Sequence, residues 1–534
     1  MDFKTEGEKI ILKNNIFKVI YRTTKSKQSE VFYSCVRCGE LFSSKHGAIT
    51  HVCKNRYKIQ NFDIVSIPPI STSEPTSKKN VADYRLVVEQ LIRFVCTSNI
   101  PLHAMDNEYF RRALNILNPD FDFQLRETMA KRIIEFAEEL KNKTYEKLAN
   151  QKVSLLFDSA KKWSRNYQGV ICHTPDELFL LSLDITKDNK AETITPIIID
   201  VIQKLQNHNS EVTAICTDSD NTNKSVFDPD KGIIQKLTQD NFIRQPCCAH
   251  IANLAIEDTF VRNDENRFIY ENIHAILQNE NPHNLKKSGF PHIQTIRWNS
   301  LYYCVKYIMK NIIKNTDSIN NEVQKCIDTI ESKITWENLL NILKLMNNFI
   351  KFVEKDESNL SSMMNELIYT YNHLSNNENQ VSKCLAECLF KRFFHDYPLN
   401  LPAFAYLLTK EGLVYVFSAT EEEKQVYINY AIDGLKDYIE KRKFQNSEEI
   451  LWLFNNYLES QPIEWFSDNK TLYEQWKEIP NDFGIIACEV LSIPCSEAAV
   501  ERLYSFLTSI TSSSMYNSSF ESIEARLMIH LDSI

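Results

Sequence analysis

The sequence predicts an α/β protein whose mixed sheet is interrupted by a large, all-helical insertion. Short apolar runs rich in β-branched residues lie between residues 153 and 218. Amphipathic helical periodicity then continues almost without a break from about Ile251 to Ile479, and the last segment, from Phe483, could complete the core. Because 534 residues are too many for one compact core, we expect several structural units.

Four apolar runs are typical of buried strands: Val153–Asp158, Gly169–His173, Glu177–Leu183 and Val212–Asp218. A helical stretch, Glu192–Gln206, separates the third run from the fourth. Three strands, a helix and a further strand form the opening of a ribonuclease-H-like sheet, although many α/β folds share that order.

Helical periodicity also surrounds the expected sheet. Before it, residues 82–150 predict three helices, of which the second covers Glu108–Leu117 and the third covers Leu125–Ala149. After it, the clearest helical stretches are Trp336–Phe352, Met363–His373 and Val381–Phe394.

The composition excludes several classes of protein. Only 9 glycines occur and no Gly-rich phosphate loop is present, so a nucleotide-driven motor or a dehydrogenase is not expected. The most apolar stretch, Leu401–Ala419, contains Lys410 and Glu411 and is too short to span a membrane. The scattered cysteines are typical of a reducing compartment, and we expect a soluble intracellular protein.

Charge is distributed unevenly along the chain. Residues 1–58 have a net charge of +7, whereas the remainder has a net charge of −16. A basic head before an acidic body predicts that the head makes most of the contacts with nucleic-acid phosphates. A merely solvated basic tail is the alternative interpretation.

The basic head contains a possible zinc site. Cys35 and Cys38 are followed, after twelve residues, by His51 and Cys53, and a pair of thiolates with two further ligands of this kind favours a structural Zn²⁺ ion. His46 could replace either His51 or Cys53. The segment resembles a BED-type zinc finger, a DNA-binding module. A linker rich in Ser, Thr and Pro follows it.

Two aspartates end predicted strands. Asp158 ends the first strand and Asp218 ends the fourth, and neighbouring strand ends would bring their carboxylates together. Hard oxygen ligands of this kind suit Mg²⁺ or Mn²⁺ in two-metal phosphoryl transfer. Asp220 competes with Asp218 for this role, and an acidic residue after a strand is more often a helix cap or a turn former.

Several sequence blocks together resemble the hAT (hobo/Activator/Tam) superfamily of DNA transposases, and the similarity runs in order over about residues 85–534. The block nearest the C-terminus is the most specific. The blocks are FDSAKKWS (157–164), ICTDSDNTN (215–223), CCAHIANLAIED (247–258), IRWNS (296–300) and LSIPCSEAAVERLYS (491–505).

The resemblance implies roles for individual residues. It assigns the catalytic Asp/Asp/Glu triad to Asp158, Asp218 and Glu501. It also implies that Arg297 and Trp298 hold distorted DNA, although Trp298 could instead be a buried core residue.

The resemblance further implies that Cys247 and His250 support the active site rather than bind a metal. Tyr504 stands where the family usually has Phe. Glu497 lacks a match to the family block, and we therefore expect its substitution to have little effect.

The resemblance also implies a function. We expect a nuclear DNA transposase that cleaves transposon ends and joins them to target DNA with Mg²⁺ or Mn²⁺. It would act as a homo-oligomer, at least a dimer, and would not associate with a membrane. The C-terminal helices, with the apolar residues Ile523, Leu527, Ile529 and Leu531, would supply the dimer surface. The alternatives are a domesticated nuclear DNA-binding protein that no longer cleaves, and a structural protein that binds other proteins.

The expected organisation has six parts. They are a zinc finger (1–57), a linker (58–80), a helical DNA-binding or dimerisation region (81–150), the first part of the ribonuclease-H-like core (151–265), the all-helical insertion (266–481), and the second part of the core with the C-terminal dimerisation helices (482–534).

Overall fold

The computed structural model divides the chain into two compact units. It describes residues 81–117, 126–227, 241–279, 300–313, 321–397, 400–460, 463–467, 469–510 and 519–533, and the backbone of four strands near the N-terminus. The first unit comprises Met1–Val88 with Ser533–Ile534, and the second comprises Glu89–Asp532.

The first unit contains an antiparallel sheet in the order β1-β2-β3-β4. Its strands are β1 (Lys9–Leu12), β2 (Asn15–Thr23), β3 (Ser29–Cys35) and β4 (Leu41–Phe42). Helix α2 (Val81–Thr97) crosses the boundary between the two units.

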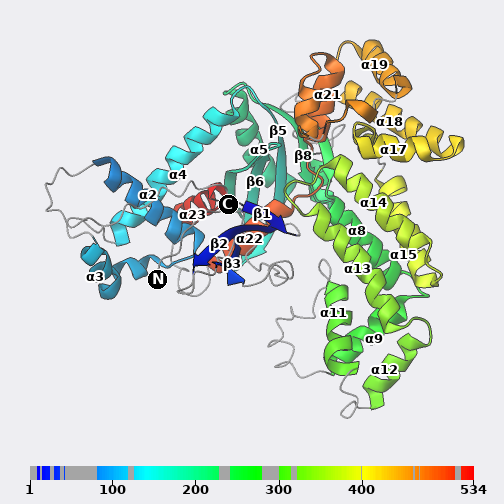
Figure 1. Ribbon diagram of the computed structural model, residues 1–534, viewed down its shortest axis with the longest axis horizontal. Coiled ribbons are helices and arrows are strands. Elements are labelled where there is room, and N and C mark those ends of the chain that lie inside the picture. Colours follow the sequence, from blue (N-terminus) through cyan, green and yellow to red (C-terminus); the bar gives the residue numbers. More distant parts are fainter. Residues whose placement is uncertain are drawn as a thin grey trace. The chain divides into compact units, whose positions relative to one another are not determined.

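A five-stranded mixed sheet lies at the centre of the second unit (Figure 1), in the order β7-β6-β5-β8-β9. Strand β6 runs antiparallel to both of its neighbours, β5 and β7, whereas β8 and β9 run parallel to β5. The four predicted strands are therefore confirmed, and β9 was not predicted. The strands are β5 (Lys152–Lys162), β6 (Arg165–His173), β7 (Leu178–Thr186), β8 (Glu211–Thr217) and β9 (Ile243–Pro246).

The prediction that Asp158 ends the first strand is wrong, because β5 continues to Lys162. The strand stops pairing with β8 after Leu156 but continues along β6 to a two-residue turn. Trp163 and Ser164 form this turn with positive φ angles of 45° and 62°, which suit the twist of a tight hairpin. The extension lacks an apolar run because its residues are only partly buried, so the sequence pattern did not identify it.

Helices cover both faces of the sheet. Alternate residues Val153, Leu155 and Phe157 of β5 share a core with α4 (Arg126–Leu148) and α5 (Ala191–Gln206). Because side chains alternate between the faces of a strand, Asp158 belongs to the opposite face. Helix α22 (Ala498–Ile510) packs there against β5 and β6.

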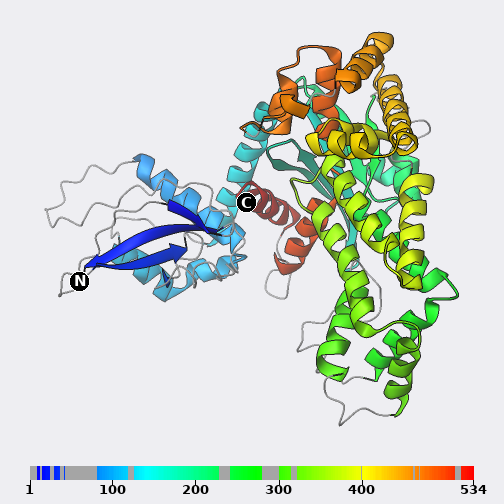
Figure 2. The same cartoon turned by 45° about the vertical axis from the view of Figure 1, so that its right-hand side comes forward.

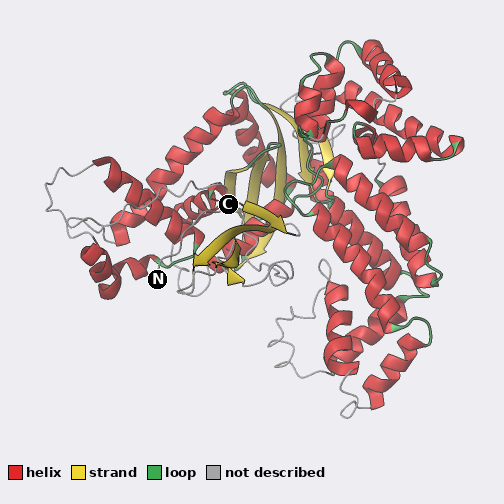
Figure 3. Ribbon diagram, in the orientation of Figure 1, coloured by secondary structure: helices red, strands yellow, loops and turns green. Residues whose placement is uncertain are grey.

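The helical insertion shares one continuous core with the far side of the sheet. Buried residues connect Ala214 in β8 to Cys495, after the last insertion helix. The insertion lies beside the sheet (Figures 1 and 2), and Figure 3 shows that its described residues form helices joined by loops. The described α-helices between β9 and α22 are α8 (Cys248–Glu257), α9 (Arg267–Gln278), α11 (Ser300–Ile308), α12 (Asn321–Glu331), α13 (Trp336–Val353), α14 (Leu360–Ser375), α15 (Gln380–Phe390), α16 (Asn400–Leu407), α17 (Lys410–Ser418), α18 (Glu421–Arg442), α19 (Ser447–Ser460), α20 (Leu472–Lys477) and α21 (Asp482–Leu491).

The predicted helices are confirmed, with small changes at their ends. Helices α3 (Glu108–Leu117), α4, α5, α13 and α14 coincide with predicted stretches to within a few residues. The predicted stretch Val381–Phe394 is divided, because α15 ends at Phe390 and a π-helical segment, Lys391–Asp396, follows. None of the described helices has the length and apolar character needed to cross a membrane.

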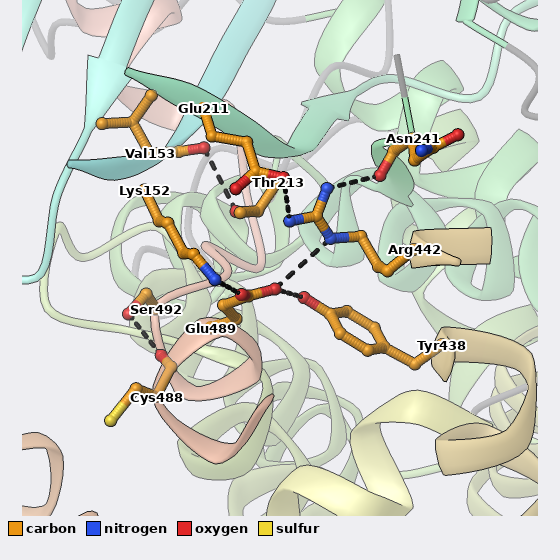
Figure 4. A network of polar contacts seen from close by, with 10 residues as sticks. All are labelled: Lys152, Val153, Glu211, Thr213, Asn241, Tyr438, Arg442, Cys488, Glu489 and Ser492. Carbon is orange, nitrogen blue, oxygen red and sulfur yellow. Dashed lines mark hydrogen bonds and ion pairs between the residues drawn. The ribbon is translucent and has the colours of Figure 1, made fainter. Parts of the chain in front are cut away.

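A buried polar network fastens the insertion to one end of the sheet (Figure 4). Glu489 of α21 accepts hydrogen bonds from Lys152 at the start of β5, from Tyr438 (2.5 Å) and from Arg442 (3.3 Å). Arg442 also donates to Glu211 at the start of β8, at 2.7 Å. The network therefore joins α18 and α21 to the first residues of two neighbouring strands.

The C-terminal helix α23 (Phe520–Asp532) corrects one expectation. Ile523, Leu527 and Ile529 are buried inside the chain, where α23 packs against α4 and β7. Their apolar side chains complete the core of this unit, so these three residues do not supply a surface for dimerisation.

Candidate active site

Asp158 and Asp218 lie at the same level of two parallel strands. The register pairs Leu156 of β5 with Cys216 of β8, and each aspartate follows two residues later. Residues two apart on a strand share a face, so both aspartates belong to the face that α22 covers. Each carboxylate is partly buried. The expected juxtaposition of the two aspartates is therefore present, although Asp158 lies within a strand rather than at its end.

The loop after β8 orients Asp218. The side-chain amide of Asn223 and the backbone N–H of Asp220 (3.3 Å) both donate to Oδ1 of Asp218. Asp220 is exposed, and its Oδ1 accepts the backbone N–H of Asn223 at 2.6 Å. Asp220 therefore caps the short helix α6 (Asn221–Phe227), as an acidic residue after a strand often does.

Arg244 of β9 is a cation that the sequence analysis missed. Its guanidinium donates to the backbone carbonyl of Asp218 at 2.8 Å and to the Thr217 hydroxyl at 3.3 Å. These bonds fix the end of β8 from the neighbouring strand. Burial raises the pKa of Asp220 above its usual value, and the positive charge of Arg244 offsets part of that rise.

Cys247 connects the end of β8 to the segment before α22. Its backbone N–H donates to the Thr217 carbonyl at 2.8 Å, and its thiol lies 3.5 Å from the Ser496 hydroxyl. Burial raises the pKa of the thiol well above its usual value. His250 lies one turn further along α8, partly buried and within electrostatic range of Asp220.

Helix α22 makes close contact with the β5–β6 hairpin. The Tyr504 hydroxyl donates to the backbone carbonyl of Asp158 at 2.5 Å and lies 3.3 Å from the carbonyl of Tyr167. Gly169, which pairs with Asp158, allows this approach, since a Cβ there would lie 2.9 Å from Val500 Cγ1 and 3.0 Å from Tyr504 Oη. The helix is therefore held directly over Asp158.

Glu501 lies one turn before Tyr504 on α22 and is partly buried. Its carboxylate is close enough to Asp158 to raise the pKa of that residue. Burial raises the pKa of Asp158 most, and with the negative charges of Glu501, Asp218 and Asp220 it brings the pKa to about 8. Asp158 thus lies among like charges that only a cation or a proton can offset.

Glu497 was expected to have no role, and the structure places it at the same site. Its side chain is only 1% exposed, and Asp158, Glu501 and the Cys247 thiol lie close to it. Its Oε2 atom is buried without a hydrogen-bond partner. Burial, and next the charge of Asp158, raises the pKa of Glu497 well above its usual value.

Other residues proposed from the sequence lie outside the described part of the chain. These are Arg297 and Trp298, and the zinc-finger residues Cys38, His46, His51 and Cys53; of Cys35 only the backbone is described, at the end of β3. Within the described ranges, no three His, Cys, Asp or Glu side chains stand close enough together to hold a metal ion.

Comparison with protein-family models and with curated proteins found no match to this chain. The resemblance to hAT transposases therefore rests on the sequence blocks alone.

Proposed function

We propose that this protein is a DNA transposase of the hAT class that cleaves and joins DNA through a carboxylate triad of Asp158, Asp218 and Glu501. The observation that carries the proposal is the strand register that sets Asp158 and Asp218 level with each other, together with a position of Glu501 close enough to raise the pKa of Asp158. Asp218 follows Asp158 by 60 residues and Glu501 follows it by 343 residues, and the helical insertion separates Glu501 from both aspartates. The triad that the family resemblance implies is therefore compatible with the fold.

The sheet topology supports the same proposal. Three antiparallel strands followed by two parallel strands, in the order β7-β6-β5-β8-β9, is the order expected of a ribonuclease-H-like core. The long helical segment between β9 and α22 corresponds to the insertion that the resemblance implies.

The donor chemistry of the site fits a hard divalent cation. Carboxylate oxygens are the preferred ligands of Mg²⁺ and Mn²⁺. The Oε2 atom of Glu497 has no hydrogen-bond partner among the described residues, and a bound cation would be such a partner. The carboxylates repel one another as they stand, so a bound cation would draw them together. When bound, the metal ions would activate the attacking oxygen and stabilise the leaving oxygen.

The chain's own residues would orient this chemistry. Asn223 fixes one oxygen of Asp218, Arg244 holds the backbone at the end of β8, and Tyr504 holds α22 over Asp158. Asp218 is then the second ligand, because the strand register sets it level with Asp158, and Asp220 is the cap of α6, whose Asn223 N–H it accepts. We further propose that residues 1–57, which include the zinc-finger sequence, contribute DNA contacts through their basic charge.

A cleavage assay on DNA carrying the element's own ends, with Mg²⁺ or Mn²⁺, tests the proposal. We expect cutting by the parent protein and none by Asp158→Asn or Asp218→Asn. Asp220→Asn is the matched control, since asparagine keeps the cap while removing the same charge. DNA binding without cleavage by the parent would contradict the proposal and favour a domesticated DNA-binding protein.

A further inference from the structure

Two fully buried glutamates, eight residues apart, have opposite environments. Glu489 and Glu497 are 3% and 1% exposed and lie on either side of the turn that leads from α21 into α22. Glu489 has two cations and a phenol as partners (Figure 4). Glu497 has no cation among its described partners, and its Oε2 atom accepts no hydrogen bond from any residue that the structure describes.

A buried carboxylate without a cation is costly, so the environment of Glu497 requires an explanation. Its nearest charged neighbours are Asp158 and Glu501, which repel it. The Cys247 thiol is its hydrogen-bonding neighbour and is only a weak donor. No described residue donates a hydrogen bond to Oε2, so this buried atom has no hydrogen-bond partner in the described part of the chain.

We propose that Glu497 is a further carboxylate ligand of the divalent cation, with its unpartnered Oε2 facing the cation beside Asp158. This inference rests on the proposed function and adds a ligand from outside the Asp/Asp/Glu triad. A divalent cation shared by Asp158 and Glu497 would satisfy the orphaned oxygen and offset the repulsion between the two side chains.

The backbone at Glu497 supports such a role. Glu497 directly precedes α22, and its carbonyl accepts the backbone N–H of Val500 at 2.8 Å. The segment before it is anchored from the other side by the bond from Cys248 N–H to the Cys495 carbonyl, at 2.8 Å. The position of Glu497 is thus fixed by main-chain bonds, which leaves its carboxylate free to bind a ligand.

Mn²⁺ binding to the full-length protein without DNA, measured by electron paramagnetic resonance, tests the inference. We expect Glu497→Gln to weaken Mn²⁺ binding by about tenfold or more, which equals about 1.4 kcal/mol. Without metal, Glu497→Gln should fold with unchanged or higher stability, because it removes a repelled charge. Glu489→Gln is the matched control: it should lower stability and leave the Mn²⁺ affinity at the parental value.

Two further variants separate the possible outcomes. Glu497→Asp keeps the charge on a shorter side chain and should bind Mn²⁺ with an affinity between those of the parent and Glu497→Gln; it also serves if Glu497→Gln fails to fold. Parental Mn²⁺ affinity in Glu497→Gln or in Glu497→Asp, with reduced affinity in Asp158→Asn, would overturn the inference and leave the proposed function intact. A parent that binds no Mn²⁺ would also overturn it, and the cleavage assay would then decide the proposed function separately.

Discussion

The Tyr504 hydroxyl donates a hydrogen bond of 2.5 Å to the backbone carbonyl of Asp158. This bond connects the helix that carries Glu501 to the strand that carries the first aspartate of the site. Tyr504 is almost fully buried, so its hydroxyl has no access to water as an alternative partner. The hAT block that this segment resembles usually has Phe here, and in this chain the added hydroxyl connects α22 to β5.

Tyr504→Phe should lower the free energy of unfolding by about 1–3 kcal/mol, because a buried carbonyl loses its donor while the ring remains packed. Urea denaturation measures the loss. Tyr109→Phe is the control, since Tyr109 is 78% exposed and should not affect stability. Equal stability of Tyr504→Phe and the parent would show that the hydrogen bond contributes nothing.

Gly169→Ala should destabilise the protein by about 1–3 kcal/mol, because the new Cβ would lie 2.9 Å from Val500 Cγ1 and force α22 away from the hairpin. Val500→Ala removes that obstacle. In the Val500→Ala background, Gly169→Ala should therefore cost about 1 kcal/mol less than in the parent. A double-mutant cycle by urea denaturation measures this coupling, and strictly additive effects would contradict the contact.

The pKa of Asp158 predicts how stability depends on pH without metal. The pKa of Asp158 is about 8 in the folded chain and 3.8 ordinarily. Between these two pH values the folded chain keeps the Asp158 carboxyl protonated, whereas the unfolded chain does not. The stabilising contribution is complete below about pH 4 and is lost as the pH rises through about 8. Urea denaturation in a chelator should show falling stability from pH 5 to 9, and Asp158→Asn should flatten that fall.

Arg442→Met should destabilise the protein by about 3–5 kcal/mol, because it leaves Glu489 buried with one cation fewer. Glu211→Gln changes the half-exposed member of the same network and should cost less than about 1 kcal/mol. Thermal or urea unfolding of both variants measures the difference. Similar losses in the two variants would show that burial does not set the strength of this network.

The sequence predicted the sheet well because its strands are continuous apolar runs. It missed β9 because only four residues form that strand, and Arg244 and Gln245 interrupt its apolar character. It also placed the end of β5 too early, because the strand beyond Asp158 is paired but only partly buried. A strand that pairs through its backbone but lacks apolar side chains has no hydrophobic pattern by which the sequence would identify it.

Part of the candidate site was predictable because the strands that position it were predictable. Strand register brings Asp158 and Asp218 together, and register follows from the strands themselves. Glu497 was missed because a glutamate is rarely fully buried, so its charge alone favours a surface position. The available signal was its place as a single charge within the otherwise uncharged stretch IPCSEAAV. The apolar face of α23 could not be assigned from sequence, because a buried face and a dimer face have the same pattern.

The last prediction concerns Glu501, the residue that the insertion separates most widely from the two aspartates. Glu501→Gln keeps the size of the side chain and removes the charge that would bind metal. We expect a folded, DNA-binding protein whose cleavage rate falls by about a thousandfold or more, which equals about 4 kcal/mol of transition-state stabilisation.

Ser505→Ala is the matched control for Glu501→Gln. It lies one turn along the same helix, where its hydroxyl donates to the backbone carbonyl of Glu501, at 3.1 Å. It should cut at close to the parental rate, because the Glu501 carboxylate is unchanged. Single-turnover cleavage on pre-bound DNA measures both variants without interference from binding. If Glu501→Gln cuts as fast as the parent while Asp158→Asn and Asp218→Asn do not, Glu501 is not the third member of the triad. Glu497, the other carboxylate near Asp158 at the start of α22, would then be the residue to test in its place.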